Sequence, residues 1–280
     1  MISLWLALSI IVGSLGSVIV LYAGYRKGGL TKEGLLAGIL VGFTTGALGS
    51  YAWWLLLVAF FLSSTALTMY KAKAKAVFKE KFQKTGRRDA YQVFANGGPG
   101  SLAAVALALS NLLGNPATKP LMAFFVGTMA SVTADTWATE LGVLSKKNPR
   151  LIIGFQEVEK GTSGAVSPLG ELATVLASLF IGFLALVFSF LPQSALYPAS
   201  FIHGVVGGVA GCTIDSLMGA TIQGFYKCQV CGKETEKPIH CGAPAKLLRG
   251  SRRVGNDLVN FTSSTLAGLI CALLSLTAGI

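Results

Sequence analysis

About eight long apolar runs, separated by short polar segments, divide the chain. A helix needs about 20 mostly apolar residues to cross the hydrocarbon core of a bilayer. The pattern therefore predicts an all-α fold, a single polytopic membrane helix bundle over residues 1–280 with about eight transmembrane helices. We expect these helices at 2 to 24, 34 to 50, 51 to 68, 99 to 115, 119 to 141, 168 to 191, 199 to 222 and 254 to 279.

The positions of Lys and Arg predict how the bundle is oriented. All of them except Lys119 lie in four connecting segments, 25 to 33, 69 to 98, 142 to 167 and 223 to 253. Loops rich in these residues stay in the cytoplasm, so we expect both termini outside and a basic cytoplasmic loop at 69–98. No basic stretch precedes the first apolar run, so we expect a retained first helix and a location in the plasma membrane.

The loop at 69 to 98 opens with the segment KAKAKAVFKEKFQK. Its lysines have two interpretations, an interfacial helix on anionic lipid headgroups or a solvated topology signal. We favour the second, because basic residues are expected beside any membrane helix that ends in the cytoplasm.

Composition agrees with a membrane protein and excludes an ordinary soluble domain. The 280 residues are 52% hydrophobic and 12% charged, whereas charged residues make up about 25% of a soluble domain. The chain has 34 glycines, which let membrane helices approach closely. A net charge of +11 would suggest a nucleic-acid partner in a soluble protein. Here it follows from the basic loops, so no nucleic acid is expected.

Carboxylate and amide side chains gather near the cytoplasmic ends of four predicted helices. Ionisable residues are costly inside a membrane and mark functional sites by default. Carboxylates beside amides suit Mg²⁺, a hard cation that binds oxygen and bridges substrate phosphates. The alternative is hydrogen bonding between helices or a path for protons. The residues are Asp135, Glu140, Glu171, Asp215, Asn256, Asp257 and Asn260.

Two glycine-rich segments are predicted to open helices from the same face. Exposed backbone N–H groups and the positive end of the helix dipole favour phosphate there. Neither segment has P-loop spacing, and each taken alone also fits a cap or turn. Arg252 and Arg253 are the nearby basic residues best placed to hold phosphate oxygens. The segments contain Asn96, Gly97 and Gly98, and Lys160, Gly161, Thr162, Ser163 and Gly164.

The loop at 223 to 253 carries a C-x-x-C pair, Cys228 and Cys231, followed by His240 and Cys241. Three thiolates and an imidazole suit tetrahedral Zn²⁺, so a structural zinc knuckle is one interpretation. Free cytoplasmic thiols are the other, because one ion would have to accept two adjacent residues, His240 and Cys241.

Several segments together resemble a known membrane family, domain-of-unknown-function family ninety-two. They are NGGPGS, ADTWATELG, KGTSGAVSPLGE, IDSLMGA, CxxCGK with HCG, and NDLVN, and the likeness covers nearly the whole chain. The family is similar to the group containing plant phytyl-phosphate kinase and animal transmembrane protein nineteen. A more distant similarity concerns CTP-dependent polyprenol kinases and phosphatidate cytidylyltransferases, which carry an aspartate-bearing helix followed by a K-x-x-x-G loop. Asp135 and Lys160 to Gly164 match that order, but Ser163 stands where a glutamate is expected.

The resemblance implies a membrane-embedded kinase that converts an isoprenyl monophosphate of the phytyl type into the diphosphate, using Mg²⁺ and a nucleoside triphosphate, CTP or ATP. Phosphoryl transfer asks mainly for positioning and charge stabilisation. On this hypothesis Asp135 and Asp215 hold Mg²⁺, while Glu140 or Asp257 adds a ligand or positions water. Nucleotide phosphates would contact Lys160, Thr162 and Ser163. Asn96, Asn256 and Asn260 would orient substrate or metal-bound water.

Two other functions stay open at this point. A CTP-dependent cytidylyltransferase would use the same metal and phosphates, but it would release pyrophosphate and form a CDP-lipid. A lipid or ion transporter would often show inverted repeats and polar residues at the membrane midplane. We find no convincing repeat, and the acids favour one face of the membrane.

Overall fold

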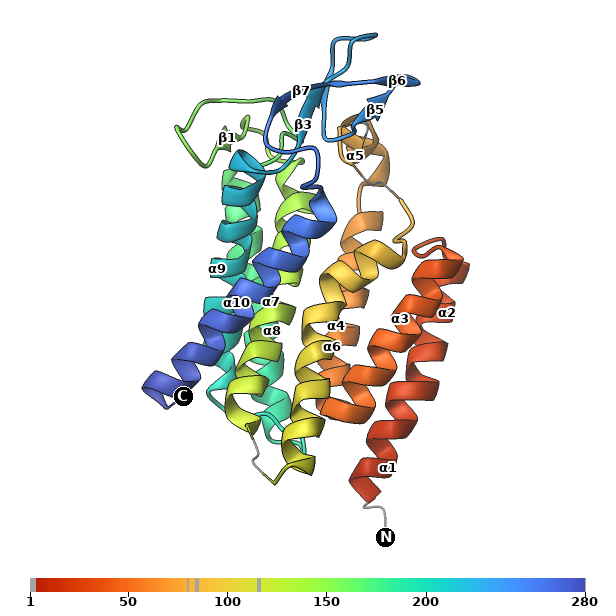
Figure 1. The fold of residues 1–280 in the computed structure, drawn as a ribbon, viewed down its shortest axis with the longest axis vertical. Helices are drawn as coiled ribbons and strands as arrows, with labels where there is room; N and C mark the ends of the chain where they lie inside the picture. The colour runs from red at the N-terminus through yellow and green to blue at the C-terminus, as the bar shows by residue number, and fades with distance from the viewer. Residues whose placement is uncertain (1–3, 80, 84–85, 115–116, 280) are drawn as a thin grey trace.

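The computed structural model describes residues 4–79, 81–83, 86–114 and 117–279 as a bundle of long helices with loops and short strands at one end (Figure 1). The helices, of which η1 and η2 are π-helical, are α1 (Leu4–Ile11), η1 (Val12–Gly16), α2 (Ser17–Arg26), α3 (Lys32–Thr44), η2 (Thr45–Gly49), α4 (Tyr51–Met69), α5 (Ala72–Lys79), α6 (Ala90–Leu112), α7 (Thr118–Gly142), α8 (Pro168–Ser189), α9 (Ser200–Thr221) and α10 (Asn256–Ala278). The strands are β1 (Arg150–Leu151), β2 (Ala165–Val166), β3 (Phe225–Lys227), β4 (Glu234–Thr235), β5 (Ile239–His240), β6 (Ala243–Pro244) and β7 (Lys246–Arg249). They form the antiparallel sheets β1-β2, β4-β3-β7 and β5-β6.

The structure confirms the polytopic helical bundle. Within the described ranges, 6 helices are long and apolar enough to cross a membrane: α1 to α2 as one continuous helix, α4, α6, α8, α9 and α10. The two other predicted spans correspond to α3 with η2 and to α7. Because α7 packs against α6, α8, α9 and α10, much of its surface meets protein, and it needs less apolar character than a lipid-facing helix.

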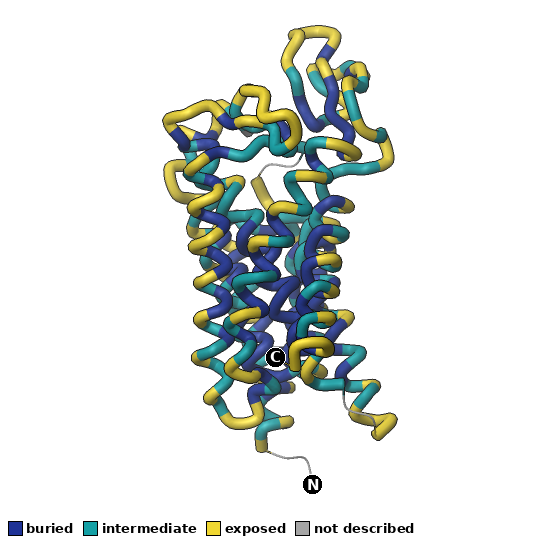
Figure 2. Tube along the Cα trace, turned by 90° about the vertical axis from the view of Figure 1, so that its left-hand side faces the viewer, coloured by how far each residue is buried: buried dark blue, intermediate teal, exposed yellow. Residues whose placement is uncertain are grey.

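The distribution of buried residues also fits a membrane protein. Figure 2 shows buried residues along the middle of the bundle and exposed residues on its outer side. Many of the exposed residues are large and apolar, and Leu36, Leu102 and Phe183 are each more than half exposed. Large apolar side chains exposed in such number on the outside of a bundle indicate contact with another apolar phase, such as lipid.

Both ends of the described chain lie at one end of the bundle (Figure 1). The described parts of the four basic segments, 25–33, 69–98, 142–167 and 223–253, lie at the opposite end together with the short strands (Figure 1). This arrangement agrees with the alternation that the basic residues predict.

Two glycines bring α7 and α9 into close contact. A Cβ on Gly207 would lie 2.5 Å from the Cα of Gly127, so no larger residue fits at this crossing of the two helices. Both helices run toward the strand-bearing end (Figure 1). Asp135 and Asp215 each follow their glycine by the same number of residues. The two carboxylates are therefore carried at the same depth.

The fourth helix begins earlier than predicted. Asp89 Oδ1 accepts a hydrogen bond from Gln92 N at 2.9 Å, and Gln92 Oε1 accepts one from Asp89 N at 3.4 Å, so a capping box starts α6 at Ala90. The segment 96–101, expected before the helix, lies within it, with Pro99 in the interior. The predicted end at 115 lies outside the described residues, as do residues 2 and 3 of the first predicted helix.

Candidate functional site

A polar cavity of about 260 Å³ lies at the end of the bundle that carries the basic loops. Its walls come from α4 to α10 and from the loops at that end. The structure thus brings together most of the side chains selected from the sequence. These are Asn96, Asp135, Glu140, Lys160, Gly161, Thr162, Ser163, Gly164, Glu171, Asp215, Asn256 and Asn260.

Asp135 and Asp215 line the cavity from the neighbouring helices α7 and α9. Asp215 Oδ2 accepts a hydrogen bond from Ser263 Oγ at 3.0 Å. The carboxylate of Asp135 makes no hydrogen bond with another described side chain. Its oxygens are therefore the more available of the two for a ligand in the cavity.

Asn260 connects three of the helices around the cavity. Its side-chain amide lies 3.2 Å from Asn96 Oδ1 in α6 and 3.2 Å from Asp215 Oδ2 in α9. A carboxylate only accepts hydrogen bonds when it is ionised, so the orientation with the amide nitrogen toward Asp215 satisfies that carboxylate. Asn260 and Ser263, both from α10, thus orient the Asp215 side chain.

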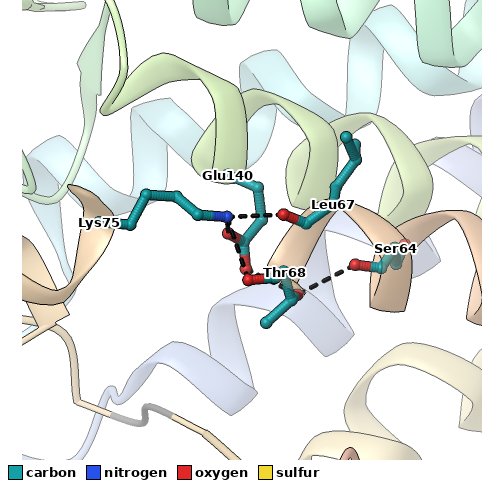
Figure 3. Close-up of polar contacts among 5 residues, drawn as sticks. All are labelled: Ser64, Leu67, Thr68, Lys75 and Glu140. Atoms are coloured by element: carbon teal, nitrogen blue, oxygen red, sulfur yellow. Dashed lines mark hydrogen bonds and ion pairs between the residues drawn. The ribbon is translucent and has the colours of Figure 1, made fainter. Parts of the chain in front are cut away.

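Glu140 also lies in the cavity wall, but both of its carboxylate oxygens have protein partners (Figure 3). Thr68 Oγ1 donates to Oε1 at 2.7 Å, and the Lys75 ammonium forms an ion pair with Oε2. Lys75 further donates to the carbonyl oxygens of Leu67, at 2.6 Å, and Thr68, at 3.2 Å. The solvated interpretation of the basic run thus fails for Lys75, whose side chain is 4% exposed.

The loop at 160 to 164 lines the cavity, and the hydroxyl group of one of its residues has no hydrogen-bond partner among the described residues. Lys160 Nζ donates to the carbonyl of Ser145, and Ser163 Oγ donates to Gln223 Oε1 at 2.8 Å. The guanidinium of Arg249 donates to the backbone carbonyl of Ser163. Thr162 Oγ1 is buried and has no hydrogen-bond partner among the described residues. Thr162 is also one of the residues that line the cavity.

Gly164 holds this loop against α9. Its φ is +73°, and a Cβ there would lie 2.2 Å from the backbone nitrogen of Ala220. Gly161 has φ +81°, but a Cβ there would meet nothing closer than Lys81 Cδ, at 3.5 Å. The two glycines therefore share the left-handed backbone and differ in how closely another element approaches them.

We expect Gly164→Ala to destabilise the protein by about 3 kcal/mol or more, because overpacking adds to the strain of a left-handed alanine. Gly161→Ala should lose only about 1 to 2 kcal/mol, from the strain alone. Unfolding of both variants in detergent, followed by circular dichroism, measures the difference. Equal losses would mean that the contact with α9 contributes nothing.

Glu236 lies in the cavity wall, on the segment between β4 and β5. Its carboxylate accepts a hydrogen bond from Gln83 N at 3.0 Å, and its backbone N–H donates to Lys81 O at 2.8 Å. Burial raises the pKa of Glu236 to about 7. Near neutral pH this carboxyl therefore exists in both its protonated and its charged form. No sequence pattern singled out Glu236, because it lies among other polar residues of the loop at 223 to 253.

Some of the residues predicted to bind metal, substrate or phosphate do not line the cavity. Gly97 packs within α6 against α3, where its Cβ would lie 2.6 Å from Val41 Cγ1. Arg252 and Arg253 are exposed. The residues outside the lining are Gly97, Gly98, Arg252, Arg253 and Asp257.

The cavity also takes polar side chains that the sequence patterns did not single out. Arg88 Nη1 donates to Thr65 Oγ1 at 3.0 Å, and its guanidinium lies 5.7 Å from the ring centre of Phe61. Its backbone pairs with Gly29 and Thr31 before α3, which fixes it at the cavity edge. In the sequence it is one basic residue among many in its loop. Among the additional residues are Thr68, Lys75, Arg88, Gln92, Gln223 and Glu236.

The donor set in the cavity fits a divalent cation that prefers oxygen. Mg²⁺ is held by one or two carboxylates plus substrate phosphates and keeps several waters. Asp135 and Asp215 offer the carboxylates, and Thr162 offers a buried hydroxyl without a described partner. A second and different donor set lies in the cysteine loop, where Cys228, Cys231, His240 and Cys241 come together.

Comparison with known proteins gives a consistent family. The family described as "Integral membrane protein DUF92" matches residues 15–268. Protein PGR of Arabidopsis thaliana is 32% identical over 273 residues, which cover 92% of this chain and 93% of that protein. An uncharacterised membrane protein of Methanocaldococcus jannaschii is 32% identical over 194 residues, 69% of this chain and 75% of its own.

Protein VTE6, chloroplastic, of Arabidopsis thaliana is 28% identical over 246 residues, 88% of this chain and 65% of that protein. No solved structure matches the chain significantly.

Proposed function

The chain belongs to the family of integral membrane proteins DUF92, and from this premise we propose that it is an isoprenyl monophosphate kinase. It transfers the terminal phosphate of a nucleoside triphosphate to a lipid phosphate of the phytyl type and forms the diphosphate. The observation that carries the proposal is the junction of the polar cavity with an apolar pocket. The motif resemblance to the phytyl-phosphate kinase group supports the same substrate class.

The apolar pocket lies between α2, α3, α4 and α6 and has a volume of about 60 Å³. At its deep end, Trp54 Nε1 donates to Ser17 Oγ at 2.8 Å, and Gly42 lies beside them. Its other walls are mainly aliphatic and aromatic side chains. The residues that line both the pocket and the polar cavity are Arg88, Gln92 and Asn96.

A substrate with an apolar tail and an anionic head fits this junction. The part of the tail nearest the head would lie in the pocket, where it gains about 0.8 kcal/mol for each buried methylene group. The head would then lie beside the guanidinium of Arg88, which can bind two phosphate oxygens at once. The cavity opens among basic loops, so we place the site on the cytoplasmic face, where nucleotides are supplied, and the protein in the plasma membrane.

The transfer would break the bond between the terminal phosphorus and its bridging oxygen in the nucleotide. One oxygen of the lipid phosphate forms the new bond to that phosphorus, and the nucleoside diphosphate leaves with the bridging oxygen. The attacking oxygen is already ionised, so no strong general base is needed. When held by Asp135 and Asp215, Mg²⁺ would neutralise part of the phosphate charge. The Lys160 ammonium keeps two donors beyond the one used by Ser145.

The protein can be tested in detergent with Mg²⁺, phytyl or geranylgeranyl monophosphate, and either CTP or ATP, with mass analysis of the products. A lipid diphosphate appearing together with a nucleoside diphosphate supports the kinase. Pyrophosphate with a CDP-lipid would instead establish a cytidylyltransferase. Folded protein that gives no product with any of these substrates would overturn the proposal and favour transport.

The pocket should contact the tail of the substrate. Val20 lines the apolar pocket, and we expect Val20→Phe to lower kcat/KM for geranylgeranyl monophosphate about 10-fold or more, because the phenyl ring occupies space that the tail needs. Val18→Phe, on the same helix at a position 44% exposed, is the matched control. If both variants turn over this substrate at the same rate, the tail lies elsewhere.

A further inference from the structure

The cysteine loop, residues 228–241, lies at the loop-bearing end of the bundle and takes no part in the proposed transfer. Four of its side chains offer one ligand atom each, and all of these atoms lie within 4.8 Å of one another. We propose that Cys228, Cys231, His240 and Cys241 bind one structural Zn²⁺. Three thiolates and one imidazole form one of the common tetrahedral zinc sites, with Zn–S bonds of about 2.3 Å and a Zn–N bond of about 2.0 Å.

The first two cysteines form a turn that presents sulfur to a metal. The backbone N–H groups of Val230 and Cys231 point at Cys228 Sγ, at 3.4 Å and 3.5 Å. Gly232, with φ +71°, closes the turn by donating its N–H to Cys228 O at 3.1 Å. N–H groups directed at a sulfur stabilise the charge of a metal-bound thiolate.

The second pair solves the problem posed by two adjacent ligands. Cys241 has φ +53°, a left-handed conformation that is uncommon for a residue with a side chain. The bend brings both neighbours to the same point, because His240 Nδ1 lies 3.2 Å from Cys241 Sγ and 3.5 Å from Cys231 Sγ. Cys241 and Gly242, with φ +53° and +75°, form the two-residue turn between β5 and β6, as hairpins of this length favour, so the hairpin itself brings the two ligands together.

Apolar packing contributes little to the two ends of the cysteine loop, which carry the ligands. β5 and β6 are two residues long each, and the apolar side chains Val230 and Ile239 are both 65% exposed. A segment that small has no hydrophobic core of its own, and small units of this kind commonly depend on a metal. The zinc ion would supply the missing cross-link.

The zinc site would also hold Glu236 in the cavity wall. The segment with Glu236 lies between the two ligand pairs, and Thr235 Oγ1 and Glu236 N both donate to Lys81 O, at 3.0 Å and 2.8 Å. Loss of the metal would therefore loosen one wall of the cavity. This consequence rests on the proposed kinase, whereas the metal site itself does not.

The test is metal analysis of the full chain, purified in detergent with a tag that contains no histidine. We expect about one zinc ion per chain, and its loss in Cys231→Ser and Cys241→Ser. Cys271→Ala is the matched control. Cys271 is buried in α10, outside the cysteine loop, and its thiol donates a hydrogen bond to the carbonyl oxygen of His203 at 3.3 Å. This variant should keep its zinc.

Cobalt provides a second readout that does not need a variant to fold without metal. Exchange of zinc for Co²⁺ should give the absorption of a tetrahedral thiolate site, and His240→Cys should keep the metal and shift its sulfur-to-cobalt absorption. Protein that holds neither metal under reducing conditions would overturn the proposal. Both measurements are independent of lipid turnover, so failure of the kinase proposal leaves them unaffected.

Discussion

Asp135→Asn is expected to lower turnover of an isoprenyl monophosphate by about 100-fold to 1,000-fold, the loss typical when one preorganised electrostatic group is removed from a transition state. The amide keeps the shape of the side chain and removes the charge that would hold Mg²⁺. Asp135 should be more sensitive than most residues because its carboxylate has no hydrogen bond to another described residue. Initial rates of diphosphate formation at saturating nucleotide measure the effect.

Glu157→Gln is the matched control for this experiment. Glu157 is an exposed carboxylate in the same group of loops, where it accepts a hydrogen bond from Asn148 at 2.7 Å, and it does not line the cavity. We expect its turnover to be unchanged. Asp135→Asn protein that turns over substrate at nearly the original rate would remove Asp135 from the metal site and leave the acids of the cavity with a packing or proton-conducting role.

The bundle was predictable because a bilayer restricts the choice of structure. Apolar length identified the long helices, and the basic loops correctly predicted that alternate connections share one end. The start of α6 was missed because its first turns are too polar and glycine-rich to look membrane-spanning. The capping box of Asp89 and Gln92 was the available signal, and Pro99 concealed it, because proline inside a helix usually marks a boundary.

The candidate site was partly predictable for a related reason. Acids and amides that are costly in a membrane converge at the helix ends, so Asp135 and Asp215 could be paired from sequence alone. The pairing of Glu140 with Lys75 could not be predicted, because the two residues are far apart in the chain and nothing distinguishes Lys75 from the other lysines of its basic run. The adjacency of His240 and Cys241 argued against a shared metal, whereas the turn at Cys241 brings their ligand atoms close to those of Cys228 and Cys231.

Glu140 either serves only to form its ion pair with Lys75, which is a structural role, or also takes part in the transfer, and stability measurements test the first role. Lys75→Met should destabilise the protein by about 3 kcal/mol or more, because it leaves a carboxylate, 20% exposed, without its counter-charge. Glu140→Gln should lose less, since Lys75 keeps its bonds to the carbonyl oxygens of Leu67 and Thr68. The double variant should recover most of the stability, because neither charge is left alone.

Turnover of the same four proteins separates the two roles of Glu140. Both of its oxygens are engaged by Thr68 and Lys75, so we expect it to position α5 against α4 and α7 rather than to bind metal. Diphosphate formation should then return together with thermal stability in the double variant. A double variant that is as stable as the unchanged protein but inactive would contradict this expectation. Glu140 would then take part in the transfer itself, and the ion pair with Lys75 would have to open when substrate binds.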